Sequence, residues 1–298
     1  MTDNKTTVRE VSIVLGAPAA VPIKEGRISD PGIKLNFTEF KNINKAFAPM
    51  VRNLEFDVCE MAAVTFFQAL AAGKPLRLLP VVLVGRLHHG SMFYDPSNGS
   101  LKPEELAGRR VGVRAYTQTT GMWVRGILSE QYGVPLDEVT WVTTEDAHVA
   151  EYTNPANVEK LDDANLIQML QDDEVCAIIM GPKQSEGLSL ERVIPDYEAA
   201  GEAWYEKHHT VPINHMVVVT EDLIERDPEA VKSIYKMLCQ GIDEVQAGKS
   251  GGPHSAVDYG IDKIWNGGAL QLAMQYAVEQ KLIPREFDRD ELFVNITL

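Results

Sequence analysis

Two adjacent histidines form the sharpest chemical feature of the sequence. His88 and His89 stand in the polar turn 85–90 (GRLHHG), directly after the apolar run 78–84 (LLPVVLV). Two neighbouring rings in a turn leave at least one of them free to face a cleft. Because imidazole titrates close to neutral pH, it can deliver a proton and be recharged. The sequence therefore predicts His89 as a proton donor and His88 as a substrate contact.

Other residues stand where they could hold an anion. Arg86 and Arg114 each follow an apolar run, and a guanidinium suits bidentate recognition of a carboxylate, although an arginine at a strand end can also be a solvated rim residue. Thr119 and Thr120 open a predicted helix, whose N-terminus attracts anions. A plain helix cap without a ligand fits these threonines equally well. We expect a small anion as the ligand.

Four further side chains could complete such a site. Glu60 ends one apolar run and could orient a hydroxyl or tune a histidine, or it could face solvent. His215 opens another run and either closes the cleft or packs in the core. Trp123 is expected in the core or stacked on an aromatic ligand, and Arg125 is expected to reach the cleft or a neighbouring acid.

A metal site is an alternative use of the same groups. Glu60 and His215, together with the two histidines of the turn, could converge on a divalent ion, since carboxylate and imidazole suit several such metals. No HxH or HExxH spacing supports one. We therefore predict no metal and no other cofactor.

Apolar runs of strand type alternate with helical patterns, which favours a largely parallel sheet with helices on its faces. The predicted strands are Val11–Leu15, Lys34–Phe40, Phe56–Cys59, Leu78–Val84, Val111–Arg114, Val139–Thr143, Val175–Met180 and His215–Thr220. The main predicted helices are Asn44–Leu54, Thr65–Ala72, Thr120–Tyr132, Leu166–Leu170, the helix that begins at Asp227, and Asp258–Lys281. The stretch 144–157 is predicted to be a loop, and 195–209 shows no clear period.

Length, charge and composition restrict the class of protein to which this chain can belong. A chain of 298 residues exceeds one ordinary domain, which favours two lobes. The formal charge of −15 argues against a nucleic-acid partner. Three scattered cysteines are expected to be buried reduced thiols. The N-terminal stretch 1–16 has no continuous apolar segment of a secretory signal, and no transmembrane span is predicted, so we expect a cytoplasmic protein.

Several longer runs resemble the 4,5-dihydroxyphthalate decarboxylase family. They are LKPEELAGRRVGVRAYTQTTGMWVRGILSEQYGV (101–134), FxxMVRNLEFDVCEM (47–61), QMLQDDEVCAIIMGP (168–182) and VPINHMVVV (211–219). The resemblance implies an α/β, two-lobe clamp of the type II periplasmic-binding-protein-like fold with a central cleft. Lobe I would comprise residues 1–88 and 214–298, and lobe II would be the inserted residues 89–213.

The resemblance also implies a function. It indicates a carboxy-lyase of aromatic compound degradation that removes carbon dioxide from a hydroxylated aromatic carboxylate such as 4,5-dihydroxyphthalate, by protonating the ring carbon. The family's expected Arg-His pair at the histidine turn is replaced here by His88 and His89, which bears on the substrate. The alternative is a solute-binding protein for an aromatic or other small organic anion on the same fold, or a biosynthetic enzyme that acts on another small carboxylate. The expected partner is a small aromatic carboxylate without nucleic acid or membrane, and a homo-oligomer is left open.

Overall fold

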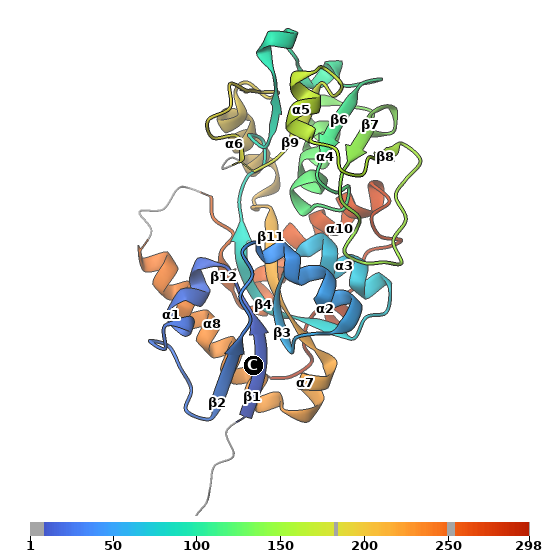
Figure 1. The fold of residues 1–298 in the computed structure, drawn as a ribbon. Coiled ribbons are helices and arrows are strands. Elements are labelled where there is room, and N and C mark those ends of the chain that lie inside the picture. The colour runs from blue at the N-terminus through green and yellow to red at the C-terminus, as the bar shows by residue number, and fades with distance from the viewer. Residues whose placement is uncertain (1–8, 182–183, 249–253, 298) are drawn as a thin grey trace, which may run out of the picture.

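Two six-stranded sheets, one above the other in Figure 1, form the framework of the chain. The fold is described by a computed structural model, which covers residues 9–181, 184–248 and 254–297. Two parts of the sequence predictions lie outside the described residues. They are residues 1–8, which belong to the stretch expected to lack an export signal, and Pro182, which ends the family-like run 168–182. Among the described residues, no helix combines the length and hydropathy needed to cross a membrane.

The first sheet has the strand order β12-β4-β11-β3-β1-β2. Its strands are β1 (Arg9–Val14), β2 (Ile33–Phe37), β3 (Val58–Ala62), β4 (Leu76–Gly85), β11 (Ile213–Thr220) and β12 (Asp258–Tyr259). Strand β1 pairs in parallel with β2 and β3, whereas β11 lies antiparallel between β3 and β4. Every residue of β3 is buried, as expected for a strand that is covered on both faces.

The second sheet has the order β10-β5-β9-β6-β7-β8. Its strands are β5 (Met92–Tyr94), β6 (Arg110–Val113), β7 (Thr140–Thr143), β8 (Val158–Lys160), β9 (Ala177–Ile179) and β10 (Glu191–Arg192). Strand β6 pairs in parallel with β7 and β9, so the carboxyl ends of these strands lie at one edge of the sheet. Ligands of open α/β sheets bind at such edges.

Helices cover the faces of both sheets. They are α1 (Val21–Lys24), α2 (Phe47–Asn53), α3 (Ala63–Ala71), α4 (Thr119–Tyr132), α5 (Leu166–Gln171), α6 (Tyr197–His208), α7 (Glu221–Arg226), α8 (Pro228–Gly248), α9 (Ile261–Asn266), α10 (Ala269–Glu279) and α11 (Arg289–Leu292). One hydrophobic cluster joins buried residues of α2 and α3 to those of α4 and α10. Figure 1 shows α2, α3 and α10 at the level where the two sheets meet. The two halves of the molecule therefore share part of their core.

The predicted α/β alternation is confirmed, but both sheets mix parallel and antiparallel pairs instead of being largely parallel, and β5, β8 and β10 were not predicted. The stretch 258–281, predicted as one helix, contains β12, α9 and α10, because Gly268 with a φ of 76° interrupts the helical path. The stretch 195–209 holds α6, in which only Gly201 and Trp204 are buried, so no apolar period marks it. The lobe boundaries at 88/89 and 213/214 stay a prediction; all strands of the second sheet lie between residues 92 and 192.

Candidate active site

A buried carboxylate and a half-buried imidazole meet on two central strands of the first sheet. Glu60 lies on β3 and His215 on the neighbouring strand β11. Glu60 Oε1 lies 2.7 Å from His215 Nδ1, and Glu60 Oε2 accepts hydrogen bonds from the amides of Gly16 and Ala17, at 2.7 and 2.8 Å. The carboxylate is thus held from both sides, by the loop after β1 and by the imidazole.

The charge state of Glu60 decides which of the two side chains carries the proton of their hydrogen bond. Burial by itself raises the pKa of Glu60, but the bond and charge of His215 and the amides of Gly16 and Ala17 outweigh it, so the pKa is lowered overall. An ionised carboxylate only accepts hydrogen bonds, and His215 therefore carries its Nδ1 proton. The His215 side chain is 21% exposed, against 2% for Glu60. The pair presents an oriented imidazole to solvent, the arrangement of an acid or base catalyst.

A second histidine lies beside this pair. The ring of Phe47 meets the rings of His148 and His215 edge-on, at centroid distances of 5.4 and 5.5 Å. His148 Nδ1 and Thr65 Oγ1 share a hydrogen bond of 2.9 Å. Burial, with a smaller contribution from the charge of Arg114, lowers the pKa of His148 to about 4, so its ring is neutral at neutral pH. His148 is not among the predicted site residues; it lies in the stretch 144–157, which is predicted only as a loop.

The N-terminus of α4 contacts α3 and β11, the strand that carries His215. The predicted threonine cap is absent: Gln118 occupies the N-cap position and makes no side-chain cap. The two threonines instead connect separate elements. Thr119 Oγ1 accepts from the amide of Val64 at 3.2 Å, and Thr120 Oγ1 accepts from Asn214 Nδ2 at 3.2 Å. The side-chain hydroxyls thus tie α4 to α3 and β11 at this point.

Arg114 supplies a cation near His148. It follows β6 directly and its Nη1 lies 2.5 Å from Glu145 Oε2. The Arg114 side chain is 28% exposed, so its guanidinium is reachable from solvent. The predicted strand-end arginine therefore lies close enough to His148 to influence its charge.

The predicted histidine pair lies elsewhere. His88 is fully buried, with Nε2 2.6 Å from Asn214 Oδ1. His89 is 2% exposed, with Nε2 2.8 Å from Gln131 Oε1 and its ring against Trp204 of α6. Burial first, then the charge of Arg86, lowers the pKa of His88 to about 3, and burial lowers that of His89 to about 4. Both rings are neutral at neutral pH, which disfavours the predicted role of His89 as a charged proton donor.

The remaining predicted site residues lie away from the pair. Arg86 is half-buried, donates to Ser91 Oγ at 3.3 Å, and lines a separate cavity of about 540 Å³ together with His89. Trp123 is in the core and donates to the carbonyl of Ile213 at 2.9 Å. These contacts position the turn and α4 rather than the strand where Glu60 lies.

Arg125 contradicts the expectation that it reaches the cleft or an acid. It is fully buried, donating from Nε to Gln280 Oε1 and from Nη2 to the carbonyl of Tyr116, both at 2.7 Å. Its guanidinium also lies 3.9 Å from the centre of the Tyr116 ring. Arg125 therefore fastens α4 to α10 inside the core.

The structure brings together only two of the four residues of the alternative metal site. Of its four residues, Glu60 and His215 meet, whereas His88 and His89 hydrogen-bond to amide side chains. The described part of the chain contains no group of three or more His, Cys, Asp or Glu side chains arranged to hold a metal ion.

Acid should destabilise the fold through its neutral buried histidines. The pKa of His88 is depressed to about 3, from an ordinary 6.5, so the unfolded chain binds the proton more readily. Stability is then fully present above pH 6.5 and is lost as the pH falls towards the folded pKa, at up to about 1.4 kcal/mol per pKa unit. We expect urea denaturation to show a free energy of unfolding that falls more steeply with acid in the parent than in His88→Gln. The exposed His209→Gln serves as control, and equal slopes in all three proteins would contradict the prediction.

Comparisons with known proteins agree with this framework. No family model matches the chain. It is 26% identical over 227 residues to a 4,5-dihydroxyphthalate decarboxylase of Comamonas testosteroni, covering 70% of this chain and 66% of the relative. It is 28% identical over 134 residues to a protein of the same name from Pseudomonas putida, covering 44% of this chain and 52% of the relative. The chain thus spans less than two thirds of the length of either relative.

The fold has close parallels among solved structures. The periplasmic aliphatic sulphonate binding protein SsuA of Escherichia coli superimposes with a TM-score of 0.62 at 12% identity, covering 97% of this chain and 92% of SsuA. At this identity the likeness concerns the fold alone. By sequence the chain is similar to 4,5-dihydroxyphthalate decarboxylases over part of their length, and by structure it is an α/β clamp of the type II periplasmic-binding-protein-like fold.

Proposed function

We propose that the protein is a carboxy-lyase that decarboxylates a hydroxylated aromatic carboxylate resembling 4,5-dihydroxyphthalate. The observation that carries the proposal is the imidazole of His215, oriented by the buried carboxylate of Glu60 and partly open to solvent. The relatives named decarboxylases support the reaction class.

The substrate's retained carboxylate needs a cation. We infer that Arg114, a partly exposed guanidinium near His148, supplies it, and that the N-terminus of α4 adds oriented amides and the positive end of the helix dipole. The neutral ring of His148 can hydrogen-bond to a phenolic hydroxyl, and the edge of Phe47 supplies an aromatic wall. In this proposal these groups bind the carboxylate, the hydroxyl and the ring of the acid that His215 protonates.

The proposed reaction needs only one acid. Protonated His215 gives its Nε2 proton to the ring carbon that bears the leaving carboxylate. The bond between that carbon and the carboxylate then breaks, its electron pair restores the aromatic ring, and carbon dioxide departs. The carboxylate of Glu60 stabilises the imidazolium beforehand, and His215 regains a proton from water, so each turnover consumes one proton.

This assignment moves the acid from His89 to His215. His89 is neutral at neutral pH and packs against α6, whereas His215 is paired with a carboxylate. His88 becomes a positioning residue, because it holds Asn214, which donates to Thr120 at the start of α4. The cytoplasmic location, the absence of a cofactor and the oligomeric state stay predictions.

Carbon dioxide release tests the proposal. Purified protein is incubated with 4,5-dihydroxyphthalate, other hydroxylated phthalates and hydroxybenzoates, with and without added divalent metals. We expect release from at least one dihydroxylated phthalate. Tight binding of these acids without any carbon dioxide would instead favour the solute-binding alternative.

A further inference from the structure

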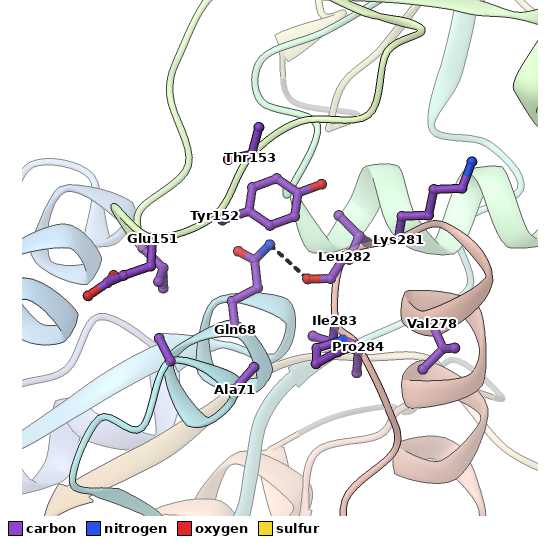
Figure 2. Close-up of a pocket in the computed structure, with 12 residues that line it drawn as sticks. Gln68, Ala71, Glu151, Tyr152, Thr153, Val278, Lys281, Leu282, Ile283 and Pro284 are labelled. Atoms are coloured by element: carbon purple, nitrogen blue, oxygen red, sulfur yellow. Dashed lines mark hydrogen bonds between the residues drawn. The ribbon is translucent and has the colours of Figure 1, made fainter.

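A cavity of about 570 Å³ lies apart from the candidate active site, between the carboxyl end of α3, the loop 149–153 and the segment 281–284. Figure 2 shows the ring of Tyr152 and the amide of Gln68 turned into this space. Neither Glu60 nor His215 lines it. Its volume falls within the range of small-molecule sites.

Two buried polar atoms in this cavity lack partners. Gln68 is only 3% exposed, and its Nε2 donates to the carbonyl of Leu282 at 3.1 Å, which fixes the orientation of the amide. Among the described residues, neither Gln68 Oε1 nor the Tyr152 hydroxyl has a hydrogen-bond partner. An unsatisfied buried polar atom is costly. Both atoms therefore keep unused hydrogen-bonding capacity.

The charged groups around the cavity are already paired at its rim. Lys281 ion-pairs with Asp137 at 3.3 Å and its side chain is 63% exposed, and Glu151 ion-pairs with Lys74 at 2.6 Å. In Figure 2 the Lys281 side chain extends away from the Gln68 amide. The interior is lined by aliphatic side chains, namely Val149, Val278, Leu282, Ile283 and Pro284. Such a space favours a neutral molecule with an apolar body over an anion.

We propose that this cavity binds a small neutral phenol, whose hydroxyl donates to Gln68 Oε1 and accepts from the Tyr152 hydroxyl. Burial, followed by the proximity of Tyr116, raises the pKa of Tyr152 well above its ordinary value, so Tyr152 remains a protonated donor. A hydroxyl group both donates and accepts, which matches the two free atoms.

A ligand bound in the cavity would also affect the position of His148 in the candidate active site. Gln68 lies one helical turn after Thr65 on α3, and Thr65 holds His148. Val149 and Tyr152, which line the cavity, belong to the same loop, 144–157, as His148. A bound phenol would therefore restrain both elements that place His148.

Fluorine NMR of 4-fluorophenol with the full chain tests the site, with 4-fluoroanisole as the matched ligand that cannot donate a hydrogen bond. We expect saturable binding of the phenol, weakened about threefold to tenfold in Tyr152→Phe and in Gln68→Met, since a neutral hydrogen bond contributes about 1 kcal/mol. Tyr152→Phe removes an unpartnered hydroxyl and should fold like the parent. Tyr132→Phe changes a half-buried tyrosine outside the cavity and should bind like the parent.

Either of two results would overturn the proposal. One is a lack of discrimination: the phenol binds the parent, Tyr152→Phe and Gln68→Met with equal affinity, or the parent binds phenol and anisole with equal affinity. The other is a loss of binding in Arg114→Gln with none in Tyr152→Phe, which would place the phenol in the candidate active site. The test does not depend on whether the protein decarboxylates anything.

Discussion

Replacing His215 with glutamine is expected to lower kcat for decarboxylation by about a hundredfold or more, since a positioned general acid contributes on the order of 10²–10⁴. Glutamine can still hydrogen-bond to Glu60 but cannot deliver a proton to carbon. Its effect should fall on kcat more than on KM, because the imidazole acts mainly in the transition state. Steady-state assays of carbon dioxide release measure both constants.

His89→Gln is the matched control for this substitution. His89 is buried, neutral and bonded to Gln131, away from Glu60 and His215. We expect its kcat to stay within severalfold of the parent's. A large loss of kcat in His89→Gln together with a nearly unchanged His215→Gln would return the acid to the histidine turn and refute the assignment.

Gly241→Ala is expected to have the largest effect on stability among the glycine positions near the site. A Cβ at Gly241, on α8, would lie 2.1 Å from the carbonyl oxygen of Ala19, and backbone yields less easily than a side chain. Ala19 belongs to the segment just after Gly16 and Ala17, whose amides hold Glu60. We expect the free energy of unfolding to fall by about 2–3 kcal/mol, as overpacking commonly costs, with a concurrent loss of activity.

Urea denaturation of Gly241→Ala and Gly248→Ala measures this effect. Gly248 ends the same helix, and a Cβ there would meet nothing within 4 Å. Its replacement should leave stability unchanged or slightly raised, given alanine's higher helix propensity. If both variants lost the same stability, the contact with Ala19 could not be the cause.

The central strands could be predicted because they are covered on both faces. Runs such as 58–62 and 213–220 are apolar almost throughout, as buried strands are. Helix α6 had no such signal: it presents mostly polar residues around Gly201 and Trp204. A pattern-based prediction depends on a buried stripe, and α6 has little of one.

The active-site pair could be predicted only in part. Glu60 and His215 were each named as candidates, but 155 positions separate them, and only the antiparallel pairing of β3 with β11 brings them together. The histidine turn was misleading for a similar reason. Nothing local in its sequence shows that Gly201 lets α6 approach the ring of His89, where an added Cβ would lie 3.3 Å from Nδ1.

Deuterium incorporation tests the central claim most directly. The protein is incubated with 4,5-dihydroxyphthalate in D₂O, and the products are analysed by mass spectrometry and proton NMR. Protonation of the ring carbon by His215 predicts carbon dioxide and a dihydroxybenzoate with one deuterium at the carbon that lost its carboxylate, both strongly reduced in His215→Gln. Unchanged substrate with no carbon dioxide, or a decarboxylated product without deuterium at that carbon, would contradict the account.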